Sequence, residues 1–375
     1  MVFALWAVAA CSGERDVATN PAEATARLDR VPLAVIGDET DDPLHGIVGA
    51  LFLGDTLVLT DRTSLTLRFY SRTTGELLHS VGGEGEGPGE FQRVGRPHRV
   101  GDRLYVWDRG LLRLSAFGTD GEFHGSTTIE PVEPYNFMSF VGLFPDGSSL
   151  LGLHQFNFDP VREPTVRRAV YVLMTYDANG AFTDSLGSFV TSDSYAEPFG
   201  RGGEQMTSAV FGRDGVVDVL GGRYYVMDNV NHAVAIFDQH GESLGVLLPD
   251  PLPEPVPVTQ ADVELVKSRG SELMRKALDE GRMPVPEHFP PYGWSGRRSL
   301  SALRTTGLGA IWVLDYGGVR DSTPTWTVYS PEGTQVMRVR SPDEVSVLAV
   351  DGDIAAVLAW NEFDVQTIEV RRILR

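Results

Sequence analysis

The sequence predicts an all-β fold: a six-bladed β-propeller closed by an N-terminal strand, with a helical insertion between blades four and five. Three observations predict it: a turn-and-strand pattern that recurs along the chain, an aromatic-to-glycine pattern that follows most copies, and a composition suited to short elements. The chain has 41 glycines and 23 prolines in 375 residues, which favours many turns. Its hydrophobic content of 42% is sufficient for a sizeable core.

The turn-and-strand pattern occurs six times. Its copies begin at Gly54, Gly101, Gly147, Gly221, Gly309 and Gly352. The second element, an aromatic residue followed by a short polar turn and a glycine, begins at Tyr70, Phe117, Tyr176, Phe237 and Tyr329. Each unit is therefore expected to form four short strands, named A to D from the axis outward, with tight A–B and C–D turns. A four-stranded unit of this length is typical of a propeller blade.

The sixth copy reaches Arg375 before a fourth strand is complete. The segment 30–38, RVPLAVIGD, has the alternation of an outer strand, and we expect it to pair with the last blade. In this arrangement Val31, Leu33 and Val35 face one side of that strand and contribute to the core. Closure of this kind removes an exposed sheet edge.

Three segments resemble the NHL-repeat family and its six-bladed relatives: 82–92 (GGEGEGPGEFQ), 104–108 (LYVWD) and 224–241. The resemblance covers about half of the chain and implies the fold rather than a function, because these motifs mark turns and strand packing. Related propellers include metal-dependent lactonases and lyases, whose metal ligands converge on the axis. The predicted A strands are mostly apolar or small, so we expect no metal site and no cofactor.

The first eleven residues form an apolar run too short to span a bilayer. The run ends in Val8-Ala9-Ala10-Cys11, which resembles the lipobox of bacterial lipoproteins, and Cys11 is the one cysteine of the chain. We therefore expect a signal peptide over 1–11 that ends at a lipidated Cys11, a flexible tether over 12–29, and a propeller over 30–375 with an insertion at about 249–299. The resemblance implies export and lipid anchoring, and Ser12 implies sorting to an outer membrane. The alternative is an ordinary chain start with a buried cysteine.

The formal net charge of −19 argues against a nucleic-acid partner, because phosphate binding requires clustered Lys and Arg. A single cysteine also excludes an intramolecular disulfide and a Cys-rich zinc module.

All long connections are predicted on one face of the propeller, which carries the B–C and D–A links. These links are 82–95, 130–136, 190–212 and 249–298 between blades, and 155–168 and 316–324 within blades. Long loops gathered on a rigid scaffold are where binding usually occurs. The long-loop face is therefore the predicted binding face, and the alternative is the accumulation of neutral insertions.

The insertion contains a predicted helix over about 260–280, with Thr259 as its N-cap and an apolar stripe interrupted by Gly270. We expect this helix to pack against the mouth of the propeller. A mobile lid or a partner-docking helix is the alternative.

Acidic residues recur where the B strands end. They are Asp61, Asp108, Asp228 and Asp315, with His154 at the equivalent position of blade three. A ring of metal ligands is one interpretation. Strand B is the second strand from the axis, however, so a structural role is favoured, in which each carboxylate accepts backbone N–H groups of the following turn.

Strand A lines the channel. The positions three residues before each A–B glycine are Leu51, His98, Phe144, Asp218, Thr306 and Ala349. The candidate ligand-binding residues are Arg96, His98, Asp218 and Arg304. A histidine and a carboxylate in one layer could support acid–base chemistry or form a structural pair. A local basic cluster, Arg93, Arg96, Arg99 and Arg103, could receive an anionic ligand or be a solvated surface.

Together these features predict a cell-envelope binding or scaffold protein that holds a protein, peptide or glycan ligand on its long-loop face. Its contact with the membrane is expected through the lipid anchor alone. The alternative is a hydrolase or lyase with an active site in the central channel. Several polar side chains that converge on one axial point would favour the enzyme.

Overall fold

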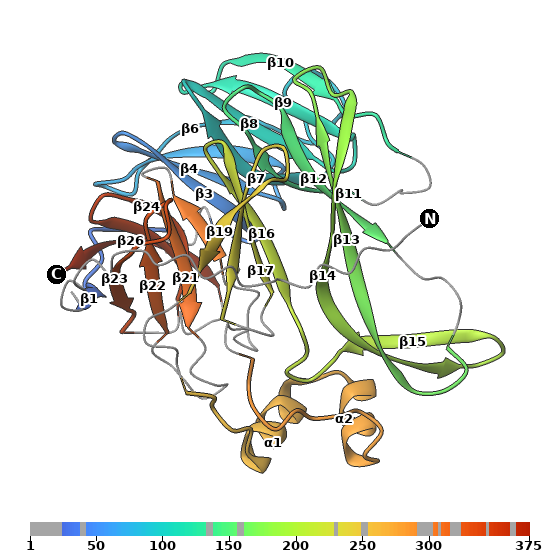
Figure 1. The fold of residues 1–375 in the computed structure, drawn as a ribbon. Coiled ribbons are helices and arrows are strands. Elements are labelled where there is room, and N and C mark those ends of the chain that lie inside the picture. Colours follow the sequence, from blue (N-terminus) through green and yellow to red (C-terminus); the bar gives the residue numbers. More distant parts are fainter. Residues whose placement is uncertain are drawn as a thin grey trace.

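The structure is a computed structural model, and strands make up nearly all of its regular elements. It describes residues 25–37, 43–132, 138–155, 161–228, 232–248, 254–290, 303–306, 309–315, 324–342, 345–360 and 365–375. This part of the chain contains 26 strands and two helices, and the strands form five sheets (Figure 1). Neither helix is long and apolar enough to cross a membrane.

Consecutive strands form antiparallel units that match the predicted repeats. The first unit comprises β3 (Ile47–Leu53), β4 (Thr56–Asp61), β5 (Thr66–Ser71) and β6 (Leu77–Gly82). The second comprises β7 (Val94–Val100), β8 (Arg103–Asp108), β9 (Arg113–Gly118) and β10 (Phe123–Thr128). The third comprises β11 (Met138–Leu143), β12 (Ser149–Gln155), β13 (Thr165–Tyr176), β14 (Phe182–Phe199) and β15 (Gly203–Ser208).

The fourth unit comprises β16 (Gly215–Leu220), β17 (Arg223–Asp228), β18 (Val234–Asp238) and β19 (Ser243–Leu247). The fifth comprises β20 (Leu303–Thr306), β21 (Ala310–Asp315), β22 (Thr325–Tyr329) and β23 (Gln335–Arg340). The sixth comprises β24 (Ser346–Asp351), β25 (Ile354–Trp360), β26 (Gln366–Leu374) and β2 (Ala34–Ile36). Tight turns that contain glycine join the two innermost strands of most units. Gly54 and Gly101 have positive φ angles of 55° and 62°, a backbone conformation that glycine adopts without steric cost.

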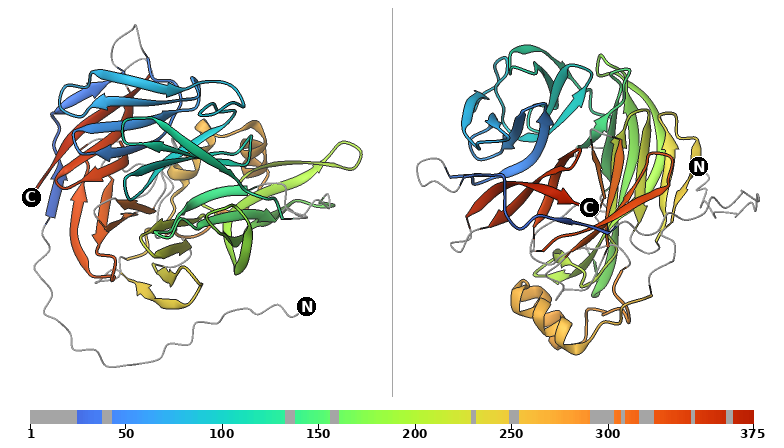
Figure 2. Two further views of the ribbon diagram at one scale, coloured as in Figure 1. Left: turned by 90° about the horizontal axis from the view of Figure 1, so that it is seen from above. Right: turned by 90° about the vertical axis from the view of Figure 1, so that its left-hand side faces the viewer.

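The first strand of each unit packs against the first strands of its neighbours. The packed pairs are β3 with β7, β7 with β11, β11 with β16, β16 with β20, β20 with β24, and β24 with β3. The sheets fan out beside one another from these strands, so the fold is β-propeller-like (Figure 2). Apolar cores fill the spaces between adjacent sheets; between the first two units, for example, Val58 and Phe69 pack with Val106 and Phe117.

An N-terminal seam joins the fifth and sixth units into one nine-stranded sheet. Strand β1 (Thr25–Leu28) pairs in parallel with β23 and antiparallel with β26. Ala26 and Leu28 are buried in the largest core. The segment expected to be a flexible tether up to residue 29 therefore contains a strand, because its alternating apolar residues fill the gap between two sheets.

Strand β2 pairs with β26, which is the pairing predicted for the outer strand of the last blade. The face of β2 that lies inward, however, is the opposite of the predicted face. Val31 is 70% exposed and Val35 is 38% exposed, and Leu33 is also exposed, whereas Ala34 and Ile36 are buried. The expectation that Val31, Leu33 and Val35 face the core is therefore wrong. A shift of one residue exchanges the two faces of a strand, and the apolar pattern VPLAVI permits both assignments.

The third unit departs most from the prediction, because β13 and β14 extend beyond the other strands of their sheet. Thr165 to Ala169 pair with Ser192 to Ala196 beyond the end of β12, and β15 then pairs with the last residues of β14. We call β15 and the extended ends of β13 and β14 the arm (Figure 1). The links expected over 155–168 and 190–212 are thus partly strands of this arm rather than loops.

The insertion contains two helices rather than the one expected over 260–280: α1 (Gln260–Arg269) and α2 (Glu272–Asp279). Thr259 caps α1 as predicted and forms a reciprocal capping box with Asp262. The helix breaks at Gly270, which adopts an extended conformation, and Ser271 then caps α2 by accepting from the Met274 N–H.

Candidate functional site

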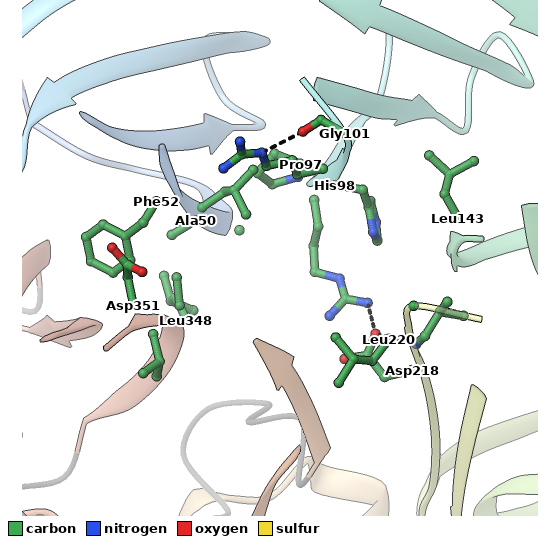
Figure 3. A pocket seen from close by; sticks show the side chains of 18 residues that line it. Ala50, Phe52, Pro97, His98, Gly101, Leu143, Asp218, Leu220, Leu348 and Asp351 are labelled. Carbon is green, nitrogen blue, oxygen red and sulfur yellow. Dashed lines mark hydrogen bonds and ion pairs between the residues drawn. The ribbon is translucent and has the colours of Figure 1, made fainter. Parts of the chain in front are cut away.

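A cavity of about 400 Å³ lies among the innermost strands, at their ends nearest the A–B turns (Figure 3). Five of these strands contribute to it: β3, β7, β11, β16 and β24. Its lining residues are Gly49 to Phe52, Arg96 to Arg99, Gly101, Leu143, Asp218 to Gly221, and Leu348 to Asp351. The cavity is therefore axial, and it lies toward the face opposite the long links.

The predicted channel positions are largely correct. Leu51, His98, Asp218 and Ala349 all line the cavity, whereas Phe144 is fully buried in the core instead. The A–B turn of the third unit is longer than the others, with the Phe144 N–H donating to Ser148 O across it. The position three residues before Gly147 therefore lies in the turn and not on β11. The side chain of Thr306 lies outside the described residues.

Arg96 and Asp218 form an ion pair across the cavity, between the second and fourth units. The distance from Arg96 Nη2 to Asp218 Oδ1 is 3.5 Å (Figure 3). Asp218 is only 5% exposed, and its Oδ1 also accepts the Val219 N–H at 3.1 Å. A buried carboxylate needs such compensation, because desolvation of an unpaired charge is costly.

His98 projects from the same strand as Arg96 and meets Phe140 edge to face, with ring centroids 4.9 Å apart. Burial, with a smaller effect from the Arg96 guanidinium, lowers the pKa of His98 from its ordinary 6.5 to about 3. His98 is therefore neutral at physiological pH and a weak base. The structure brings Arg96, His98 and Asp218 together at one cavity.

The remaining basic candidates are distributed differently. Arg304 lies on β20, with its backbone opposite Trp312, and its side chain lies outside the described residues. Arg99 lines the cavity and donates from Nε to Gly101 O at 2.9 Å. Arg93, Arg99 and Arg103 are all exposed, and Arg93 and Arg103 do not line the cavity. The predicted basic cluster is therefore divided between the cavity and the solvated surface.

Two of the acidic residues that end the B strands have the predicted structural role. The carboxylates of Asp61 and Asp108 accept backbone N–H groups of the following turn, as predicted. Asp228 accepts from the Arg213 guanidinium, and Asp315 accepts from Thr327 and Arg338. The turns that follow these two residues lie outside the described residues. Within the described ranges, no group of three or more His, Asp or Glu residues is arranged to hold a metal ion.

A second polar cluster, which the sequence does not indicate, lies at the other end of β11 and β12. Ser139 Oγ is 3.1 Å from His154 Nε2 and 3.5 Å from the Tyr171 hydroxyl. Burial, and to a smaller extent Arg109, lowers the pKa of His154 to about 4. Burial also raises the pKa of nearby Asp214 to about 6. These residues belong to the long-loop end of the third unit and its neighbours.

The arm and the two helices form one packed body on the long-loop face (Figure 1). They share a separate apolar core. Its residues are Tyr195, Val210 and Phe211 from the arm and the segment after it, and Val263, Val266, Met274, Ala277, Met283 and Phe289 from the insertion. The helices therefore pack on the arm, whereas they were expected to pack against the mouth of the propeller.

A buried polar network joins the arm to the insertion. Glu197 accepts from Tyr195 Oη at 2.8 Å and from Gln205 Nε2 at 2.7 Å. Arg282, which follows α2, forms an ion pair with Glu197 and donates to Tyr195 Oη at 2.8 Å. Because Glu197 is buried, this pairing fixes the position of the insertion on the arm.

No family model matches the chain, and no curated protein matches it. Solved structures do resemble it. A Bacteroides fragilis protein described as a "putative exported protein" is 11% identical, with 96% of this chain and 98% of that chain covered and a TM-score of 0.50. A member of the DUF4221 family from Bacteroides vulgatus is 8% identical, with 93% and 98% covered and a TM-score of 0.50.

The calcium-binding protein regucalcin from Agrobacterium tumefaciens is more distant, with 11% identity, 91% and 94% covered, and a TM-score of 0.42. At these identities the likeness to the two Bacteroides proteins concerns the fold alone. It extends over nearly the whole of each chain.

Proposed function

We propose that this protein is an exported, lipid-anchored six-bladed propeller that holds a partner on its long-loop face. The observation that carries the proposal is the body formed by the arm and the insertion, which has its own core and lies on that face. A protein or peptide partner is favoured over a glycan, because Phe199 and Met206 of the arm are 63% and 53% exposed. Exposed apolar side chains on a projecting element are typical of protein-binding surfaces.

The six-bladed count is supported by six antiparallel units whose first strands pack in succession, with β24 against β3. Closure is supported by β2, which supplies the fourth strand of the last unit from the N-terminal side. In a closed ring this strand removes an edge that could otherwise pair with another chain.

Export and anchoring are supported by the lipobox-like Val8-Ala9-Ala10-Cys11 and by the printed description of the Bacteroides fragilis neighbour. Residues 12–24 separate Cys11 from the first described strand. Thirteen residues can span at most about 45 Å when fully extended. The propeller would thus stay near the membrane, with Cys11 as its point of attachment, and Ser12 favours an outer membrane.

A hydrolase or lyase in the channel has less support. Arg96, His98 and Asp218 meet at the axial cavity, but Asp218 already forms an ion pair. A pKa of about 3 makes His98 a weak general base near neutral pH. The same groups suit binding better than proton transfer.

Site-specific photocrosslinking in intact envelopes tests the partner face. A photoreactive phenylalanine analogue replaces Phe199 on the arm, and in a matched variant it replaces Asp55, which is exposed on an A–B turn of the other face. We expect a discrete crosslinked species from position 199 and none from position 55. Equal crosslinking from both positions, or none from position 199, contradicts the proposal.

The Glu197–Arg282 pair supplies a second control. Arg282→Met leaves a buried carboxylate without its cation, which is strongly destabilising for the body. It should therefore weaken crosslinking from position 199. The double variant Glu197→Gln/Arg282→Met removes both charges and should restore the crosslink. If Arg282→Met has no effect, the arm binds the partner without the insertion.

A further inference from the structure

The charged groups that line the axial cavity are balanced. They are two guanidiniums, Arg96 and Arg99, and two carboxylates, Asp218 and Asp351. Asp351 pairs with Arg72 at 2.8 Å, and Arg99 is exposed and donates to Gly101 O at 2.9 Å. Arg96 and Asp218 are therefore the opposite charges that face each other inside the cavity.

The Arg96–Asp218 contact is long for a charge-assisted hydrogen bond. The distance of 3.5 Å between Arg96 Nη2 and Asp218 Oδ1 exceeds the usual 2.7–2.9 Å. A small molecule with one negative and one positive group could bind beside both residues. Its carboxylate would contact the guanidinium, and its ammonium would contact the carboxylate.

We propose that the axial cavity binds a small zwitterion of the α-amino-acid type that carries an apolar side chain. The ligand's carboxylate binds Arg96, its ammonium binds Asp218, and its side chain lies against the apolar wall. This wall consists of Leu51, Phe52, Pro97, Leu143, Leu220 and Leu348. The inference is independent of the partner face, because the cavity lies toward the opposite end of the molecule.

Charge and size both favour this ligand class. An anion beside the pair would also lie next to the carboxylate of Asp218, and a cation would also lie next to the guanidinium of Arg96, so a ligand that carries both charges is favoured over a ligand with one. A volume of about 400 Å³ lies near the lower end of the range for small-molecule sites, which suits a metabolite and not a folded partner. His98 is neutral and adds no charge to the cavity.

Isothermal titration calorimetry with three matched probes tests the proposal on the full-length protein. Leucine carries both charges, N-acetylleucine lacks the ammonium, and leucinamide lacks the carboxylate. We expect leucine, or its analogues phenylalanine and leucyl-leucine, to bind at least about 30-fold more tightly than either single-charge probe. Equal binding of N-acetylleucine or leucinamide, or no binding by any of the zwitterions, overturns the proposal.

Variants then locate the site. Arg96→Gln and Asp218→Asn should each weaken the binding of the zwitterion at least about 30-fold. The matched control Arg338→Gln removes a cation from the Arg338–Asp315 pair, which lies outside the cavity, and should leave binding unchanged. Ala349→Phe fills the cavity without altering its charges and should abolish binding, so the test survives if a charge variant fails to fold. Binding that persists in Ala349→Phe and Arg96→Gln places the ligand elsewhere and overturns the proposal.

Discussion

Asp108 is expected to be one of the most important polar residues for stability, because its carboxylate is fully buried and joins two segments. It accepts the backbone N–H groups of Gly110 (2.7 Å) and Leu111 (3.1 Å) in the turn after β8, and those of Gln92 (2.6 Å) and Arg93 (3.1 Å) before β7. Asp108→Ala leaves four donors without this acceptor. At about 1 kcal/mol for each bond, the variant should lose about 4 kcal/mol of unfolding free energy.

Urea denaturation followed by tryptophan fluorescence measures this loss, since the buried Trp107 adjoins the site. The matched control is Asp177→Ala. Asp177 accepts the N–H groups of Asn179 and Ala181 at 2.9 and 3.0 Å, but it lies in an exposed turn and water can replace it. We expect little change in the control. If Asp108→Ala shifts the midpoint no more than the control does, the structural role assigned to the carboxylate is refuted.

Three further predictions concern the anchor, the seam and the pH dependence. Cys11→Ser should abolish membrane retention, because acyl chains supply about 0.8 kcal/mol per buried CH₂; detergent-phase partitioning equal to that of the wild type contradicts this. In the soluble form without Cys11, deletion of 30–38 should lower the melting temperature, because Ala34 and Ile36 are buried, whereas deletion of 12–24 should not; equal melting temperatures argue against ring closure. Folding lowers the pKa of His98 to about 3, so its contribution to stability is complete above pH 6.5 and is lost as the pH falls. Between pH 7 and pH 5 the free energy of unfolding should fall by about 2 kcal/mol, and this fall should be smaller in His98→Gln. Identical urea midpoints of the wild type at both pH values would exclude this effect.

The repeated units were predictable because each contains its own local signals. The glycine of the A–B turn and the alternation of the flanking strands fix most strands without distant information. The capping role of Thr259 was predictable for the same reason, since Thr259 and Asp262 are three residues apart. At the cavity, His98 and Asp218 were placed together because both lie at equivalent positions of their repeats.

The arm was not predictable from local patterns. Residues 190–212 contain Pro198, glycines and many polar side chains, which usually indicate a loop. The segment nevertheless forms strands, because β13 extends to pair with it and the insertion covers Tyr195, Val210 and Phe211. The Ser139–His154 contact was missed for a similar reason. Its two residues meet only through the register between β11 and β12.

The parallel ladder between β1 and β23 has a mechanical consequence. Thr25, Ala26 and Arg27 pair in register with Arg338, Val339 and Arg340, and β1 also pairs antiparallel with β26. A pulling force applied to Thr25 along the axis of β1 acts parallel to these strands, so the hydrogen bonds of both ladders are loaded together in shear rather than opened one after another. Tension on the N-terminal side is thereby distributed over the fifth and sixth units before it reaches β2.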